Sequence, residues 1–77
     1  MSPAYQAVAR VACDLLNADP YRRLEDVVEN HEFRYEQLKI WGAIRIASVS
    51  RLSEVLKKYC QVTGRSVMPR RRDPPLR

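Results

Sequence analysis

The sequence predicts an all-α fold, a small bundle of three or four helices followed by a disordered basic C-terminal tail. Apolar residues recur at helical spacing in three segments. A serine or aspartate followed by proline, a typical helix start, precedes the first two segments. The composition changes at residue 64, beyond which arginine and proline dominate. We therefore expect one helical domain, residues 1–63, and an Arg/Pro-rich tail, residues 64–77.

The first helix is expected from Pro3 to about Asn17. The Ser2 hydroxyl can accept a hydrogen bond from an unpaired amide of the first turn, and a proline at the first helical position sacrifices no hydrogen bond. The helix would bury one apolar stripe, made of Tyr5, Val8, Ala9, Val11, Ala12, Leu15 and Leu16.

Asp19 and Pro20 repeat this start signal and predict a second helix from Pro20 to about Asn30, packed antiparallel to the first. His31 would stand where this helix ends, so we expect it to interact with the exposed carbonyls there. Phe33 would anchor the following connection to the core. The buried residues of the second helix would be Tyr21, Leu24, Val27 and Val28.

Residues 34–62 contain no proline and one glycine, and they fit a single helical wheel. In its middle, apolar residues also occupy the side of the wheel that is polar at both ends. Two interpretations therefore remain open: one long helix, or two helices with a break between Gly42 and Ser48. We expect a third helix to begin near Arg34 or Tyr35 in either case. The buried side would comprise Leu38, Trp41, Ile44, Val49, Leu52, Val55, Leu56 and Tyr59.

With a break, residues 44–52, IRIASVSRL, resemble the turn and the start of the recognition helix in bacterial helix-turn-helix regulators. The resemblance implies DNA binding by the helix that begins near Ser48. These motifs usually place a glycine six residues before the valine of the SVSR run, whereas Gly42 precedes Val49 by seven.

A second resemblance covers the first two-thirds of the chain. It is carried by Leu24, Glu25, Val27, Val28, Glu29 and Phe33, and by Arg51, Leu52 and Glu54. In type and spacing these residues resemble the second and third helices of the Hha family of small enterobacterial nucleoid-associated modulators. That family has helices in short, short, long order and binds the oligomerising part of a histone-like repressor. Val49 and Ser50 replace its aspartate-histidine pair, and the Arg/Pro tail replaces its aromatic C-terminal segment.

Charge is divided unevenly between the two halves of the chain. Residues 1–33 hold three arginines and six carboxylates, a net charge of −3, while residues 34–77 have a net charge of +8. Such asymmetry indicates an anion-binding surface, most often for nucleic acid, in the C-terminal half. We expect Arg45 and Arg51 to contact bases or phosphates. Lys57, Lys58, Arg65, Arg70, Arg71 and Arg72 would add charge.

The leading hypothesis is therefore a small non-enzymatic regulator of the transcriptional type that binds DNA. The alternative is a protein interaction module, such as a nucleoid-protein modulator, an adaptor or a phage-type inhibitor of a host protein. Trp41, Ile40 and Ile46 would then contact the partner, or a second copy of the chain.

Other classes lack support in the sequence. There is no glycine-rich phosphate loop and no nucleophile with a suitably placed histidine, so we expect no enzymatic activity, cofactor or small-molecule substrate. Cys13, Cys60 and His31 show no chelating spacing, which argues against a metal site and for two reduced thiols in the core. No long apolar run or signal peptide is present, and we expect a cytoplasmic protein of a bacterium or phage without membrane contact.

Overall fold

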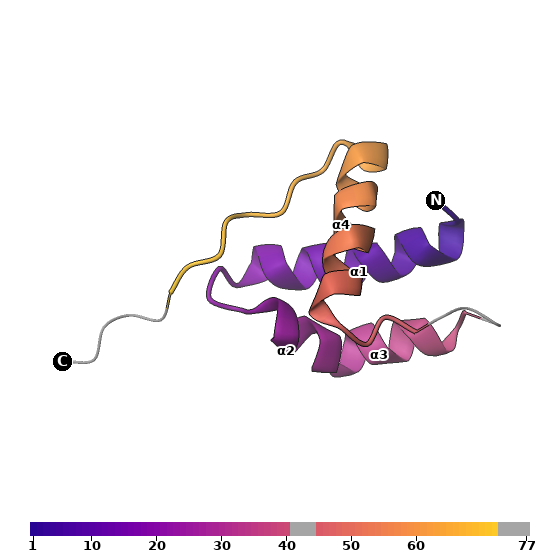
Figure 1. Cartoon of the computed structure of the whole chain (residues 1–77), viewed down its shortest axis with the longest axis horizontal. Helices are drawn as coiled ribbons and strands as arrows, with labels where there is room; N and C mark the ends of the chain where they lie inside the picture. Colours follow the sequence, from indigo (N-terminus) through magenta and orange to yellow (C-terminus); the bar gives the residue numbers. More distant parts are fainter. Residues whose placement is uncertain (41–44, 73–77) are drawn as a thin grey trace.

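The computed structural model describes residues 1–40 and 45–72, which form four α-helices and no strand. They are α1 (Pro3–Ala18), α2 (Leu24–Glu29), α3 (His31–Leu38) and α4 (Val49–Thr63). The third helix runs antiparallel beside α1, and α4 crosses α1 and α2 (Figure 1). The predicted all-α class is confirmed.

One hydrophobic core lies between α1, which contacts the other three helices, and α2, α3 and α4. The Ser2 hydroxyl accepts from the Tyr5 amide at 3.3 Å, so the predicted start of the first helix is confirmed. The predicted stripes of the first and last helices also face the core. The buried residues are Val8, Ala9, Ala12, Cys13, Leu16, Val27, Phe33, Ile46, Leu52, Val55, Leu56 and Tyr59.

The predicted start of the second helix at Pro20 is wrong. The Asp19 carboxylate accepts from the Tyr21 amide at 2.9 Å, and the Arg22 amide donates to the Asp19 carbonyl at 3.1 Å. These two bonds close a tight turn, because an aspartate side chain can bond a nearby amide in a turn as readily as at a helix start. The helix begins only after Arg23, whose amide donates to the Asp26 carboxylate.

The predicted end of that helix at about Asn30 is confirmed, since α2 ends at Glu29. The next helix, however, begins at His31 and not near Arg34 or Tyr35. The Asn30 side chain accepts from the amides of Glu32 and Phe33, at 2.9 and 3.2 Å, and so begins a new helix, α3. His31 is therefore the first residue of α3 and not the last residue of the preceding helix. Phe33 is fully buried, as predicted.

Residues 34–62 are not one helix, because α3 ends at Leu38 and α4 begins at Val49. The Ser48 hydroxyl accepts from the Arg51 amide at 3.2 Å and caps α4. The connection, residues 39–48, is longer than the three- or four-residue turn of a helix-turn-helix motif. Trp41 and Gly42, which the sequence interpretation singled out, lie outside the described residues.

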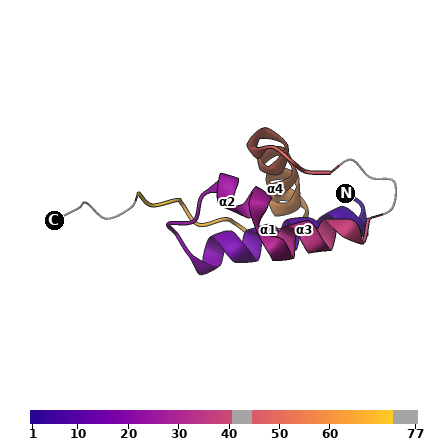
Figure 2. The same cartoon turned by 90° about the horizontal axis from the view of Figure 1, so that it is seen from below.

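The tail differs from the expected disorder over its first part. After Gly64, in the left-handed conformation with φ of 75°, the chain turns back and lies along the C-terminal half of α1 (Figures 1 and 2). We call residues 65–72 the strap. Its Ser66 carbonyl accepts from the Asn17 side chain at 3.1 Å, and its Arg71 amide donates to the Pro20 carbonyl at 2.7 Å.

Candidate nucleic-acid interface

A basic groove lies between the start of α1 and the exposed side of α4. Its volume is about 440 Å³. Three basic side chains of α4 line it, Arg51, Lys57 and Lys58, and we call them the α4 basic face. The remaining lining residues are Met1, Ser2, Tyr5, Glu54, Val55 and Gln61.

Helical geometry explains why these cations share one side. Leu52, Val55 and Tyr59 face the core, so the residues that alternate with them at helical spacing point away from it. The axis of α4 rises about 10 Å from Arg51 to Lys58, a length that spans about three phosphates of one DNA strand. The face can therefore meet several phosphates at once.

The surroundings of the groove favour an anion. The first turn of α1, capped by Ser2, forms the opposite wall, and the N-terminal end of a helix carries partial positive charge. Glu54 is the single carboxylate among the lining residues. It lies 3.4 Å from Arg51, and both side chains are well exposed, so water weakens this ion pair and leaves Arg51 free to exchange partners.

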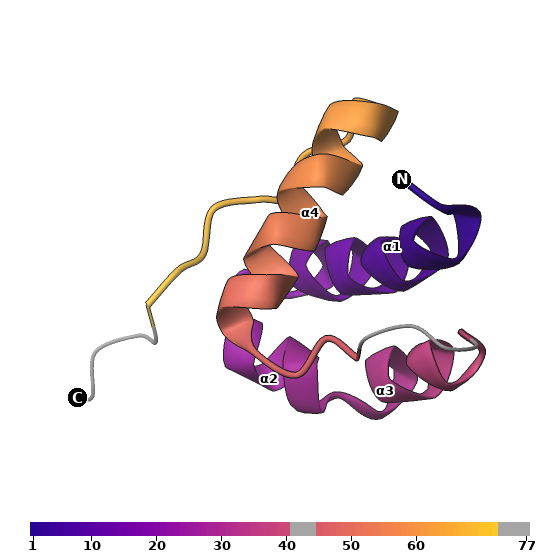
Figure 3. The same ribbon diagram turned by 45° about the vertical axis from the view of Figure 1, so that its right-hand side comes forward.

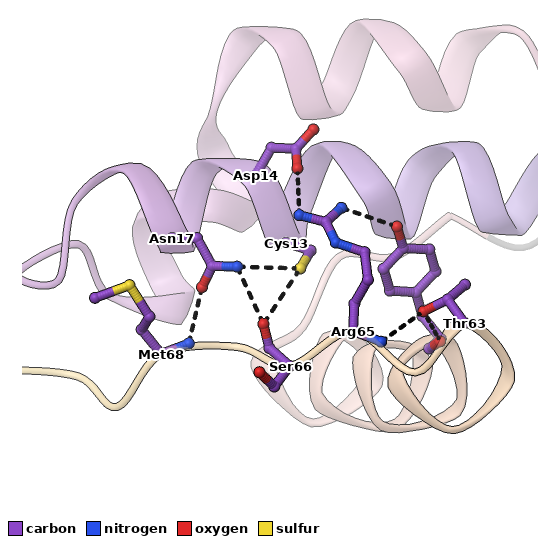
Figure 4. Close-up of polar contacts among 8 residues, drawn as sticks. Cys13, Asp14, Asn17, Thr63, Arg65, Ser66 and Met68 are labelled. Carbon is purple, nitrogen blue, oxygen red and sulfur yellow. Dashed lines mark hydrogen bonds and ion pairs between the residues drawn. The ribbon is translucent and has the colours of Figure 1, made fainter.

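Arg65 is already engaged within the chain. Its guanidinium lies 2.9 Å from the Asp14 carboxylate and donates to the Tyr59 hydroxyl at 3.0 Å (Figure 4). These two hydrogen bonds raise the pKa of Arg65 above its usual range. The residue joins the strap to α1 and α4 and does not stand free for a phosphate.

Arg70 is engaged as well, at the end of α1. Its guanidinium donates to the carbonyls of Leu16, Asp19 and Arg22 at 2.7, 3.0 and 3.0 Å. The last carbonyls of a helix have no partners within it, and a cation suits the negative end of the helix dipole. By contrast, Arg71 and Arg72 are exposed.

Arg45 lies apart from the α4 basic face. Its guanidinium donates to the Gln37 carbonyl near the end of α3. It lines a second groove, which we call the α3 groove, with a volume of about 720 Å³. The other lining residues are Val28, Glu29, His31, Arg34, Tyr35, Gln37, Leu38, Ile46 and Ala47.

The predicted partner-binding residues fall in different environments. Ile46 is 2% exposed and belongs to the core, so the interpretation of its side chain as a surplus surface group is corrected. Ile40 is partly buried against the same core, and Trp41 lies outside the described residues. Leu38 was expected in the buried stripe but is 67% exposed, because α3 ends there and no helix continues its stripe.

Sequence reasoning missed two parts of these surfaces. Met1 and Tyr5 line the groove, although helical periodicity assigned Tyr5 to the core alone. Asp14 and Asn17 hold the strap through partners about 50 positions away in the chain. No local pattern marks such contacts.

Both cysteines are free thiols, and burial raises the pKa of Cys13, which Arg65 partly opposes. Within residues 1–40 and 45–72, no three metal-ligating side chains come together. No helix in that part of the chain is long and apolar enough to cross a membrane. No protein family, curated protein or solved structure matches this chain.

Proposed function

We propose that the protein is a small DNA-associated regulator that binds the phosphate backbone through the α4 basic face. The observation that carries the proposal is the position of Arg51, Lys57 and Lys58 along one groove facing the start of α1. Arg65 and Arg70 bond inside the chain, whereas the three cations of the α4 basic face line one open groove together.

Binding of this kind is mainly electrostatic. Each phosphate that a lysine or arginine neutralises releases counterions, so the logarithm of the affinity falls with the logarithm of the salt concentration by about 0.9 per contact. The face provides charge at helical spacing and no arrangement that favours one base over another. We therefore expect affinity for duplex DNA with strong salt dependence and little sequence preference.

The test is a fluorescence titration of a mixed-sequence duplex at several salt concentrations between about 50 and 200 mM. The double variant Lys57→Gln, Lys58→Gln should bind more weakly, and its salt slope should fall in magnitude by about two. Arg10→Gln with Arg23→Gln is the matched control, because it removes the same charge from exposed residues that line neither groove.

Two results would contradict the proposal. One is absence of duplex binding by the native chain at the lowest salt. The other is an equal loss of affinity in the lysine variant and in the control, since net charge alone would then account for binding.

A second candidate function is docking of a protein segment at the α3 groove. Leu38 and Tyr35 are 67% and 64% exposed on its wall, and an exposed apolar pair beside a hollow is typical of an interaction site. Arg34 and Arg45 line the same groove, which fits an acidic amphipathic segment. A partner recovered from nuclease-treated extract with the native chain, and lost with Leu38→Ser, would support this function over DNA binding.

A further inference from the structure

The strap is held on α1 mostly by hydrogen bonds, of which those of Asn17 are exposed and those of Arg70 to carbonyls near the end of α1 are part-buried. Only Val67 of the strap packs against the core, while Ser66, Met68 and Pro69 are exposed. Segments with little buried apolar surface open at low free-energy cost compared with the whole fold. The strap is therefore an element that can leave α1 while the four helices stay folded.

One side chain of α1 binds the main chain of the strap on both sides of Val67. The Asn17 amide nitrogen donates to the Ser66 carbonyl at 3.1 Å, and its oxygen accepts from the Met68 amide at 2.8 Å (Figure 4). This pair of bonds resembles a rung of a β-ladder and does not depend on which side chains the strap carries. Asn17 is thus the central clamp of the docked strap.

Cys13 lies beneath this clamp. Its Sγ is 3.5 Å from the Asn17 amide nitrogen and 3.9 Å from the Ser66 carbonyl, and its side chain is fully buried (Figure 4). The docked strap therefore shields the thiol. Its reactivity can report whether the strap is docked or released.

The strap also starts at one end of the proposed DNA-binding surface. It leaves α4 at Gly64, one turn beyond Gln61 of the groove, and then lies on the side of α4 opposite the N-terminus (Figures 1 and 3). Fully extended, eight residues reach about 26 Å. A released strap can therefore lie along a duplex that the α4 basic face already holds.

We propose that DNA releases the strap from α1, so that Arg70, Arg71 and Arg72 leave the protein surface and bind phosphates beside the α4 basic face. This inference rests on the proposed function. Arg70 exchanges neutral carbonyls for charged oxygens, and bonds between two charged groups are the stronger kind. Arg71 and Arg72 add two cations to the same strand. Their gain offsets the loss of the Asn17 clamp, of the Arg65–Asp14 ion pair and of the bond from the Arg71 amide to the Pro20 carbonyl.

The experiment uses the full chain carrying Cys60→Ala, in which Cys13 is the remaining thiol. It measures the rate at which a maleimide labels Cys13, with and without a duplex of about 20 base pairs. We expect the duplex to accelerate labelling about tenfold or more. The acceleration should disappear in the Lys57→Gln, Lys58→Gln background, because that variant binds duplex weakly. Duplex binding with unchanged or slower labelling would overturn the release and leave the α4 interface standing, whereas absence of duplex binding would overturn both.

A second variant tests the release without a thiol reagent. Asn17→Ala changes no charge, and Asn17 does not line the groove. Alanine favours a helical conformation, so the fold should persist. Loss of two hydrogen bonds favours undocking by roughly tenfold, and duplex affinity should rise by up to that factor because less free energy is spent on release. The rise should be smaller when Arg71→Gln and Arg72→Gln are added. An unchanged or weaker affinity of Asn17→Ala would overturn the proposal.

Discussion

The side-chain amide of Gln37 makes two hydrogen bonds with the main chain of Ile46. The Ile46 amide donates to Oε1 at 2.6 Å, and Nε2 donates to the Ile46 carbonyl at 3.2 Å. Both residues are buried, so a side chain of α3 satisfies main-chain groups that water cannot reach. The pair fixes the chain just before α4 and holds the Ile46 side chain in the core.

Gln37→Leu should therefore destabilise the protein by about 2 to 4 kcal/mol. The substitution keeps a side chain of similar size but leaves the Ile46 amide and carbonyl buried without partners, at a cost of about 1 to 3 kcal/mol each. Urea unfolding followed by circular dichroism measures the difference. Gln61→Leu, at an exposed position of α4, is the control and should change stability by less than about 0.5 kcal/mol. Similar losses in both variants would contradict the role of the pair.

Gly64→Ala should destabilise the protein by about 1 kcal/mol. Gly64 has φ of 75°, a conformation that costs a residue with a Cβ about 1 to 2 kcal/mol, and apart from its two chain neighbours no residue comes within 4 Å of the place where that Cβ would be. The cost is thus conformational and not steric. Asparagine tolerates this conformation better, so Gly64→Asn should lose less than Gly64→Ala in the same thermal unfolding measurement. Equal losses would point to a different cause.

Ser48→Ala should cost about 1 kcal/mol, because it removes the hydroxyl that accepts from the Arg51 amide at the start of α4. Ser50→Ala is a matched control two positions further on. Ser50 is exposed inside the first turn and alanine favours a helix, so this variant should be neutral or slightly more stable. Urea unfolding measures both variants. A lower stability of Ser50→Ala than of Ser48→Ala would contradict the role of Ser48 as the cap.

The parts of the fold that the sequence predicts correctly depend on neighbouring residues. Ser2 and Pro3 act within one helical turn, and the stripes of α1 and α4 need only helical spacing and a core to face. Asp19 and Asn30 show the limit of such signals. Both carry side chains that can bond a nearby amide in a turn or at a helix start, and which of these forms depends on the packing of the helices around them.

The candidate site was less predictable, because the same residue type has different roles in it. Net charge indicates that the C-terminal half is basic, but it does not tell which cations are free to bind a partner. Lys57 is exposed, whereas the guanidinium of Arg70 donates to carbonyls 48 to 54 positions away. The Asn17 clamp likewise joins segments 49 and 51 positions apart. Contacts at such separations follow from how the helices pack and leave no local pattern in the chain.

The stability of the protein should depend on pH through Cys13. Burial raises the pKa of its thiol above the ordinary value of 9.0, because the thiolate would lose its hydration. Above pH 9 the unfolded chain releases this proton while the folded chain keeps it, so the folded state binds more protons and stability falls as the pH rises. The stabilising contribution is complete below the unfolded pKa and is lost as the pH passes through the folded pKa. Urea unfolding between about pH 8 and 10.5 gives the free energy of unfolding at each pH. This free energy should fall more steeply with pH for the native chain than for Cys13→Ala. The comparison uses the slopes and not the absolute stabilities. Parallel declines would mean that the thiol titrates alike in the folded and unfolded chains.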